Sequence, residues 1–173
     1  RSSDLGGGSI KKSGLYDKVT QILKENGFDW VELAGIEPNP RIESVREGAK
    51  LIHENQLDVI LAVGGGSVVD ASKVIAAAAY YDGDAWDLVK DSNLIGQAVP
   101  IVDILTLAAT GTEMNRNAVI SNISTNEKLG TGGWDLIPRA SFLDTTLTYT
   151  VSKWQTAAGS ADMMSYLFEQ YFN

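Results

Sequence analysis

The most restrictive feature of the sequence is an apolar run that ends in three consecutive glycines. Residues 58–63 contain the stretch Val-Ile-Leu-Ala-Val, and Gly64, Gly65 and Gly66 follow directly. A continuous apolar run is typical of a parallel strand that is buried on both faces. The Ala-rich segment from Ser67 to about Tyr80 then predicts a helix. A buried strand, a glycine turn and a helix N-terminus together predict one unit of a parallel α/β sheet.

Helices and apolar segments alternate along the chain from residue 13 to about residue 107. We predict helices over 13–26, 39–55 and 67–80, with caps at Ser13 and Asn39, and strands over 28–33, 58–63 and 101–107. Short strands are expected near 118–121 and 141–143, and a helical tail over 152–172 that Gly159 could interrupt. This order predicts an α/β fold with a Rossmann-like, doubly wound parallel sheet and helices on both faces.

Both ends of the sequence look unusual for this fold class. A glycine turn that opens a helix normally follows a strand, and only five residues, polar except Leu5, precede Gly6. We therefore expect the first strand to be missing. Because the sequence also stops at Asn173, directly after an amphipathic helix, we expect truncation at both ends.

Composition narrows the classes of partner. The chain has 22 acidic and 14 basic residues, a formal net charge of −8, which disfavours nucleic acid and anionic membrane surfaces. Nothing approaches the run of about 18 apolar residues that a spanning helix needs. The absence of cysteine excludes disulfides and thiolate metal sites, and it is compatible with the cytoplasm. The single histidine, His53, is expected on a helix surface.

The glycine turn has the composition of an anion cradle. Glycines let the backbone approach a pyrophosphate closely, and the free N–H groups of a helix N-terminus favour negative charge. Ser67 and Asp70 also have the spacing of a helix-capping pair. The alternative is a tight turn without a ligand. The pattern is neither G-x-G-x-x-G nor a Walker A loop, since Lys73 falls on the helix.

A second polar segment follows another apolar strand. Residues 106–115 contain three threonines and Asn115, whose hydroxyl and amide groups can contact a phosphate, a ribose or an amide of a ligand. The alternative is an ordinary turn rich in Thr.

These segments carry a family resemblance. Residues 64–73 match the pattern GGGS-x-x-D-x-x-K, and residues 106–115 match T-x-x-x-T-G-[ST]-E-x-N. Residues 127–130, 142–148 and 155–162 fit in order and approximate spacing. The chain thus resembles the iron-containing alcohol dehydrogenases over nearly its whole length, and in particular their butanol-dehydrogenase and aldehyde-reductase branch. The resemblance implies a dehydroquinate-synthase-like nucleotide-binding domain over 1–150 and the start of a helical domain over 151–173.

The resemblance also implies a nicotinamide cofactor and a small alcohol or aldehyde as substrate. Members with Gly-Gly-x-Ser at the turn that holds the adenine ribose tend to use NADP, and those with Asp there tend to use NAD. A carboxylate repels a 2′-phosphate, whereas a hydroxyl and backbone N–H groups can donate to it. We therefore expect NADP(H) to be preferred over NAD(H), with Lys11 and Lys12 assisting. The implied cofactor-binding residues are Gly7, Gly8 and Ser9 at the adenine ribose; Gly65, Gly66, Ser67 and Asp70 at the pyrophosphate turn; Thr106, Thr110 and Asn115 near the nicotinamide half; and Lys128 and Leu147.

The sequence departs from the family at the metal site. The family holds a divalent metal, usually iron or zinc, with one Asp and three His, of which the first two form a D-x-x-x-H pair on one helix. Here Asp162 is present, but Tyr166 stands at the His position, and no further His is in register. We therefore expect no tightly held metal. Tyr166 becomes a candidate proton donor, or it packs in a core; Asp162 is a ligand, or an acidic residue in the first turn of a helix.

The resulting functional prediction is an NADP(H)-dependent alcohol dehydrogenase or aldehyde reductase with an incomplete metal site. The alternatives are a nucleotide-binding module or fragment without catalysis, and a subunit whose active site a second chain completes. Apolar residues on the tail helix also predict a homo-oligomer.

Overall fold

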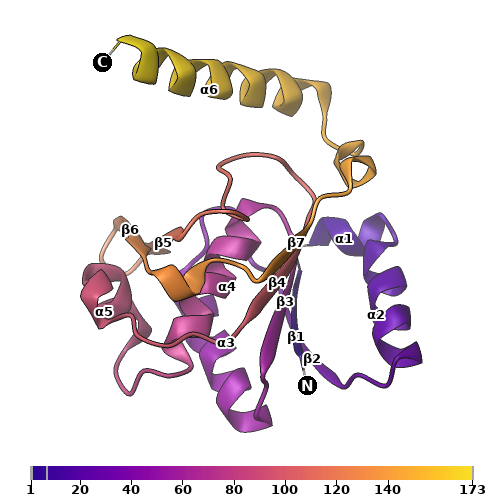
Figure 1. Ribbon diagram of the computed structural model, residues 1–173, viewed down its shortest axis with the longest axis vertical. Coiled ribbons are helices and arrows are strands. Elements are labelled where there is room, and N and C mark those ends of the chain that lie inside the picture. The colour runs from indigo at the N-terminus through magenta and orange to yellow at the C-terminus, as the bar shows by residue number, and fades with distance from the viewer. Residues whose placement is uncertain (1, 7, 173) are drawn as a thin grey trace.

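The computed structural model describes residues 2–6 and 8–172, and its centre is a five-stranded parallel sheet (Figure 1). The strand order is β2-β1-β3-β4-β7. The chain therefore starts near the middle of the sheet, adds one strand on one side, and then crosses to the other side. This is the doubly wound order in which ligands bind beyond the carboxyl ends of the strands. The strands are β1 (Ser2–Gly6), β2 (Trp30–Ala34), β3 (Val59–Gly64), β4 (Ile101–Leu105) and β7 (Ala140–Phe142).

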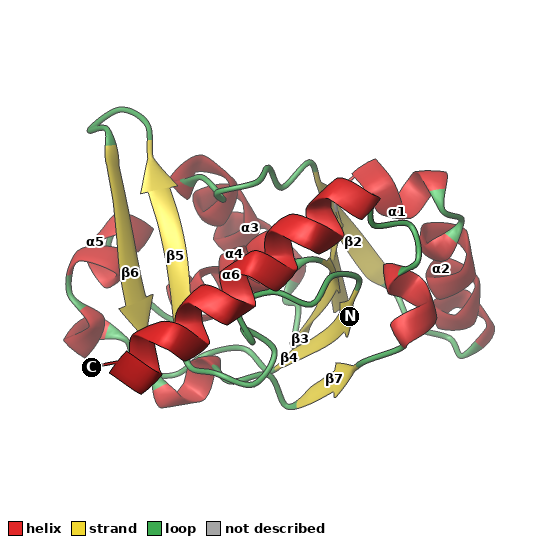
Figure 2. Ribbon diagram, turned by 90° about the horizontal axis from the view of Figure 1, so that it is seen from above, coloured by secondary structure: helices red, strands yellow, loops and turns green. Residues whose placement is uncertain are grey.

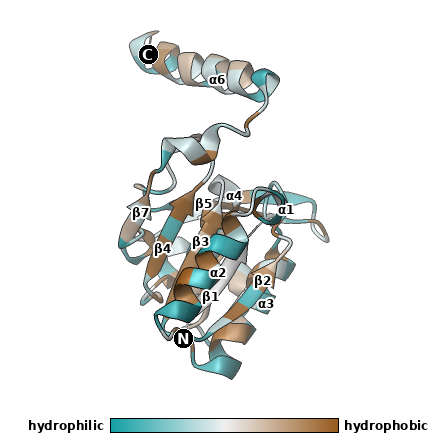
Figure 3. Ribbon diagram, turned by 90° about the vertical axis from the view of Figure 1, so that its right-hand side faces the viewer, coloured by the Kyte–Doolittle hydropathy of each residue, from teal (hydrophilic) through white to brown (hydrophobic). Residues whose placement is uncertain are grey.

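Helices cover both faces of the sheet. On one face α1 (Gly8–Lys12) and α2 (Leu15–Glu25) pack through Ile10 and Val19 against Val63. On the other face α3 (Ile42–Asn55) and α4 (Gly66–Ala78) pack against Ile60 and its neighbours. Strand β3 thus sends alternate side chains into two cores, as a strand buried on both faces must. Figure 3 shows this strand largely in the hydrophobic colour. These observations confirm the predicted α/β fold.

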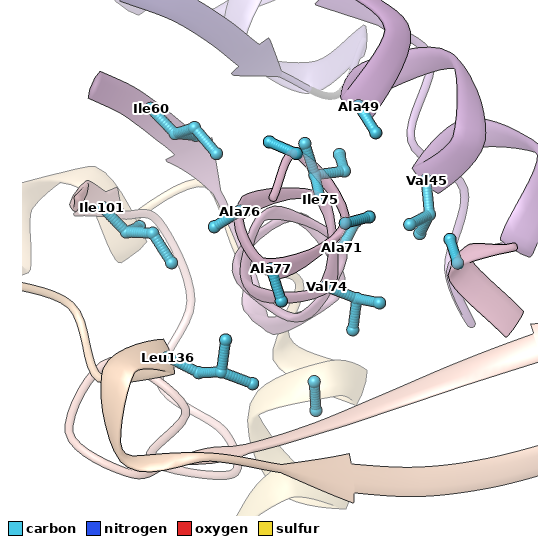
Figure 4. Packing of buried hydrophobic residues seen from close by; sticks show 14 of the residues in the cluster. Val45, Ala49, Ile60, Ala71, Val74, Ile75, Ala76, Ala77, Ile101 and Leu136 are labelled. Atoms are coloured by element: carbon cyan, nitrogen blue, oxygen red, sulfur yellow. The ribbon is translucent and has the colours of Figure 1, made fainter. Parts of the chain in front are cut away.

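Helix α4 is the centre of the larger core. Figure 4 shows Ile75 and Ala76 of this helix surrounded by side chains of the sheet, of α3 and of η2 (Trp134–Leu136). Ile75 is fully buried, and it fits closely against Gly48 of α3, where a Cβ would lie 2.6 Å from its Cδ1. Because the small alanines let neighbouring elements approach, α4 is fixed on nearly all sides.

An antiparallel hairpin lies beside the main sheet. Strands β5 (Asn117–Asn122) and β6 (Glu127–Gly132) pair with each other, and they lie against α4 and α5 (Ala85–Lys90). The hydroxyl of Thr131 donates to the carbonyl of Leu88 at 2.7 Å and joins β6 to α5. The sequence predicted a strand near 118–121 but not its partner β6. The chain also forms two further short helices, η1 (Ser92–Leu94) and η3 (Thr145–Thr148).

The prediction that the first strand is missing was wrong. Ser2–Gly6 forms β1, which pairs in parallel with β2 on one side and with β3 on the other, so that Gly6 is opposite both Ala34 and Val63. Its residues lack the apolar run of β3. The backbone pairing with two neighbours, which residue order alone does not reveal, makes this segment a strand.

Several predicted helix ends also differ. Asn39 has a left-handed backbone (φ 58°) outside the helix, which begins at Ile42, and the N-cap of α2 is Gly14 instead of Ser13. The predicted capping pair of Ser67 and Asp70 is absent, because the N-cap of α4 is Gly65 without a side-chain cap. In each case backbone geometry or a tertiary contact overrides the local propensity.

The C-terminal helix α6 (Lys153–Phe172) is continuous through Gly159 and has no buried residue. Figures 1 and 2 show it extending across the carboxyl-end side of the sheet, separated from the main body.

Candidate functional site

A cavity of about 800 Å³ lies at the carboxyl ends of the central strands. Pockets for small molecules and cofactors measure about 300–1,000 Å³. The cavity is located where the strand order reverses, which is where doubly wound sheets bind ligands. Its wall is formed by the start of α2, the glycine turn after β3, the segment after β4, and the region around η3. The lining residues used below are Gly14, Lys18, Gly64, Gly65, Gly66, Ser67, Thr106, Leu107, Asp144, Leu147 and Gln155.

The three glycines of the turn differ in what surrounds them. A Cβ on Gly64 would lie 2.7 Å from Cγ2 of Val68, so close packing requires glycine there. A Cβ on Gly65 would meet Leu107 at 3.6 Å, and one on Gly66 would meet Thr112 at 3.6 Å, which are ordinary contact distances. Neither Gly65 nor Gly66 has a positive φ. Packing therefore requires glycine at position 64 only, although all three glycines line the cavity.

The N-terminus of α4 opens into this cavity. Its N-cap, Gly65, has no side-chain cap, and its carbonyl accepts the N–H groups of Val68 and Val69 at 3.0 and 3.3 Å. The preceding N–H groups of Gly66 and Ser67 have no intrahelical partner, as at every helix start. Free N–H groups, a helix dipole and an absent Cβ together provide a site for a phosphate group.

The segment after β4 lies against the glycine turn. The N–H of Thr106 donates to the carbonyl of Gly64 at 2.9 Å, which places Thr106 in the cavity wall. Thr110 is exposed, and its Oγ1 would lie 3.7 Å from a Cβ on Gly66. Asn115 is half-buried, and its amide donates to the carbonyl of Thr110 at 3.3 Å. Thr106 therefore lines the cavity, whereas Thr110 and Asn115 do not.

A buried lysine ties this segment to α4. Lys73 has no exposed surface, and its ammonium donates to Thr112 Oγ1 at 2.9 Å and to the carbonyls of Asn115 and Asn117 at 2.7 and 2.8 Å. Burial lowers the pKa of Lys73 to about 8, against the attraction of Asp70, Asp103 and Glu113. Sequence reasoning noted this lysine as the last residue of the pattern GGGS-x-x-D-x-x-K and as a misfit to a Walker A loop, but it did not predict its burial or its partners.

Asp70 accepts hydrogen bonds from the same region of the chain instead of capping its own helix. Its Oδ1 accepts from Thr112 Oγ1 at 2.6 Å, and its Oδ2 accepts the N–H of Val119 at 3.0 Å. Asp70, predicted at the pyrophosphate turn, does not line the cavity and bonds to the segment after β4 and to β5 instead.

A second buried carboxylate, Asp103, lies on β4. Its Oδ2 accepts from Ser141 Oγ at 2.6 Å, whereas Oδ1 is buried and has no hydrogen-bond partner among the described residues. Burial raises the pKa of Asp103, and the hydrogen bond from Ser141 opposes this. The sequence showed Asp103 only as an interruption of an apolar strand.

Of the remaining residues predicted to bind the cofactor, some line the cavity and others do not. Leu147 lines the cavity. Lys128 lies on β6, where its ammonium donates to Asn39 Oδ1 at 2.6 Å, and it is not part of the cavity lining. Gly7 and the side chain of Ser9 lie outside the described residues, and Gly8 begins α1.

Sequence reasoning missed one cation in the wall. Lys18 of α2 lines the cavity opposite the region of Asp144. Hydrogen bonds from the hydroxyl and N–H of Thr146 lower the pKa of Asp144, and Lys18 adds a weaker effect. Only the position of Lys18 shortly after the first glycine turn could have suggested it. Lys11, by contrast, forms an ion pair with Glu32 at 2.5 Å.

The expected metal residues lie on α6, away from the cavity lining. Asp162 is exposed, and Tyr166 is 54% exposed, so Tyr166 does not pack in a core. Among residues 2–6 and 8–172, no group of three or more His, Cys, Asp or Glu side chains could hold a metal ion. His53 is exposed on α3, as predicted.

Within the described part of the chain, no helix is both long enough and apolar enough to span a membrane.

Comparison with known proteins adds independent findings. The chain is 59% identical over 168 residues to NADH-dependent butanol dehydrogenase A of Clostridium acetobutylicum, covering 97% of this chain and 43% of that protein. It is 43% identical to the NADPH-dependent aldehyde reductase YqhD of Escherichia coli, covering 96% of this chain and 43% of that protein. The chain thus spans less than half the length of these relatives.

A solved structure agrees with the fold. The crystal structure of NADH-dependent butanol dehydrogenase A from Thermotoga maritima superposes with a TM-score of 0.91 at 45% identity, covering 97% of this chain and 42% of that one. The sequence model of the family "Iron-containing alcohol dehydrogenase" matches residues 5–145, which include β3, the glycine turn and the segment after β4. On this agreement of sequence, fold and turn, the chain belongs to the iron-containing alcohol dehydrogenase family.

Proposed function

We propose that this chain binds a nicotinamide dinucleotide in the cavity at the glycine turn and serves an oxidoreductase that acts on small alcohols or aldehydes. The observation that carries the proposal is that Gly65 and Gly66 line the cavity at the start of α4, although packing does not require glycine at either position. Close packing requires glycine at position 64, whereas a Cβ at the next two positions would make only ordinary contacts, so we attribute these two glycines to a ligand that approaches the backbone at the start of α4. The names of the relatives, which include butanol dehydrogenase and aldehyde reductase, support the substrate class.

Different residues of the chain would bind different parts of the cofactor. The N–H groups of Gly66 and Ser67 would hold the pyrophosphate, and the hydroxyl of Thr106 would contact the nicotinamide half. Leu147 would close the apolar side of the cavity, and Lys18 would supply a positive charge at its edge. When bound, the nicotinamide would supply or accept the hydride. Thr110, Asn115, Asp70 and Lys128 would act without lining the cavity.

The cofactor preference belongs to the same proposal. An acidic side chain at the adenine ribose repels a 2′-phosphate, and the sequence has Ser9 there, so we propose that NADP(H) binds more tightly than NAD(H). Relatives are named for both cofactors, NADH for the butanol dehydrogenases and NADPH for YqhD. The preference therefore needs a direct measurement.

Calorimetric titration of the chain with NADPH and with NADH tests both statements. Binding of NADPH at micromolar concentration, and at least tenfold weaker binding of NADH, is the expected result. Ser9→Asp should weaken NADPH and leave NADH affinity within about twofold. Absence of heat with either cofactor at millimolar concentration contradicts the binding proposal, and tighter NADH binding contradicts the preference alone.

One observation favours a second candidate, a binding unit that does not complete the reaction alone. Asp162 and Tyr166 lie exposed on α6, and the described residues assemble no metal-binding group. Under this reading residues 1–150 are a nucleotide-binding domain, residues 151–173 begin a helical domain, and a further segment or a second chain provides the metal ligands. Oxidation of NADPH with butanal, in wild type and in Tyr166→Phe, separates the candidates. Turnover that Tyr166→Phe abolishes supports the tyrosine as proton donor, whereas cofactor binding without turnover supports the second candidate.

Self-association is also proposed. The exposed side chains of α6 include Met164, Leu167 and Phe168, each more than half exposed, and contiguous apolar surface of this kind is uncommon on monomers. Light scattering should give a mass above that of one 18.6 kDa chain. A monomer at millimolar concentration would contradict it. The cytoplasmic location expected from the sequence stays a prediction.

A further inference from the structure

One face of α4 connects the glycine turn to the segment after β4. Gly66, Asp70 and Lys73 are spaced i, i+4 and i+7, so they lie along one stripe of the helix. Gly66 faces Thr110 and Thr112, and Asp70 and Lys73 bond to residues 112–119. The helix that presents the glycine turn to the cavity is therefore the same helix that holds the opposing segment.

The bonds along this stripe converge on Thr112. Its hydroxyl accepts from the Lys73 ammonium at 2.9 Å and donates to Asp70 Oδ1 at 2.6 Å, so it uses both capacities of a hydroxyl group. The same ammonium donates to Asn115 Oδ1 at 3.2 Å. Thr112 itself is 2% exposed.

Two further hydrogen bonds join this segment to the sheet, from the Thr106 N–H to the Gly64 carbonyl at 2.9 Å and from the Ser141 hydroxyl to the Glu113 carbonyl at 3.1 Å. Residues 106–116 contain no helix or strand, and Thr112 is the only buried residue among them. Residues 107–110 are exposed, and Gly111 has a positive φ of 67°. A segment with so few buried contacts owes its position to specific hydrogen bonds, because packing does not fix it.

We propose that Lys73, Asp70 and Thr112 are positioning residues that fix the 106–115 segment against the glycine turn, so that the cofactor cavity is formed before the cofactor arrives. The proposal rests on the proposed function for the identity of the ligand. A preformed cavity avoids the entropy of ordering a segment during binding, and the gain appears as affinity. None of the three side chains lines the cavity, so they act through Thr106 and the backbone next to Gly66.

Substitutions at Thr112 test this without disturbing a charge. Thr112→Val keeps the shape and removes both hydrogen bonds, whereas Thr112→Ser keeps the hydroxyl and serves as the conservative rescue. Ser72→Ala is the matched control, because Ser72 is also a buried hydroxyl and lies next to Lys73 on α4, but it donates to the Val68 carbonyl of its own helix at 2.7 Å. All variants are compared in the full chain by hydrogen–deuterium exchange of residues 106–117 without cofactor and by NADPH titration.

The expected result is faster exchange of residues 106–117 in Thr112→Val, with about tenfold weaker NADPH binding, and wild-type values for both readouts in Thr112→Ser and Ser72→Ala. Unchanged exchange in a folded Thr112→Val overturns the proposal, and so does faster exchange with unchanged NADPH affinity. If Thr112→Val does not fold, Asp70→Asn is measured in its place against the same outcomes. Failure of wild type to bind NADPH or NADH contradicts the proposed function instead, and the cofactor-free exchange data still decide whether the network orders the segment.

Discussion

Substitution of Gly65 by alanine tests whether glycine is needed at this position for the fold or for binding a ligand. A Cβ at this position meets Leu107 at 3.6 and 3.8 Å, and the backbone is extended, with φ −87° and ψ −174°. Alanine fits such a position without strain, and it lowers the entropy of the unfolded chain. We therefore expect Gly65→Ala to leave the free energy of unfolding unchanged or to raise it by about 0.5 kcal/mol.

The effect on cofactor affinity should be much larger. A phosphate oxygen that accepts from the next N–H group lies about 2.9 Å from that nitrogen, so a methyl group on the neighbouring Cα competes for the same space. A hydrogen bond to a charged group is worth about 1.5–3 kcal/mol. At about 1.4 kcal/mol for each factor of ten, loss of one such bond weakens NADPH binding by roughly 10- to 150-fold.

Two further glycine substitutions act as controls in the same assay of chemical denaturation and calorimetry. Gly64→Ala places a Cβ 2.7 Å from Val68, so it should destabilise the chain by about 1–3 kcal/mol. Gly159→Ala lies on α6 with no atom within 4 Å of the new Cβ, so NADPH affinity should not change. Wild-type affinity in Gly65→Ala would refute the assignment of this turn as a pyrophosphate cradle.

Three other predictions follow from the packing, the buried lysine and the ligand count. Gly48→Ala should lower the free energy of unfolding by about 1–3 kcal/mol, because its Cβ would lie 2.6 Å from Ile75. In thermal denaturation, the double variant with Ile75→Ala should lose less stability than the sum of the two single variants. The pKa of Lys73 is about 8 in the folded state and 10.5 in the unfolded state, so the unfolded state binds more protons between these pH values. The free energy of unfolding of wild type, measured by urea denaturation relative to Lys73→Met, should therefore rise by up to roughly 3 kcal/mol from pH 8 to pH 10.5. A difference that does not change with pH would contradict the lowered pKa. Elemental analysis after chelation should find well under one iron or zinc per chain, since Asp162 has no clustered partners among the described residues, and a stoichiometric metal would show that the ligand count is wrong.

The strand, turn and helix at residues 59–78 could be predicted because every part of the signal is local. The apolar run, the glycines and the alanines follow one another, and β3 and α4 form where they indicate. Strand β1 could not be predicted this way, because its polar residues become a strand by pairing with two segments that come later in the sequence. Similarly, β6 exists because β5 lies beside it and α5 covers it.

In the site, too, local sequence patterns predicted some residue positions, whereas contacts between distant residues decided others. Gly65, Gly66 and Ser67, predicted at a pyrophosphate from their place after a buried strand, line the cavity, and their contact with a phosphate stays a prediction. Asp70 was predicted to pair with Ser67 three residues away, yet it bonds to Thr112, 42 residues away. The capping pair does not form because Asp70 instead accepts two charge-assisted hydrogen bonds, from the hydroxyl of Thr112 and from the backbone N–H of Val119.

We therefore propose that the motif GGGS-x-x-D-x-x-K combines two functions on one helix. Gly65 and Gly66 line the cavity at the start of α4, while the next two turns carry an acid and a base that bond to the segment after β4. Because the spacing i, i+4, i+7 keeps these positions on one face, a shift of the helix by one residue would misplace both functions together. A buried lysine with a lowered pKa costs stability, and its four short contacts to residues 112–117 offset that cost only while the segment stays in place. The order of the cavity wall and the burial of the lysine are thus one property, and substitutions on either side of the contact should affect both.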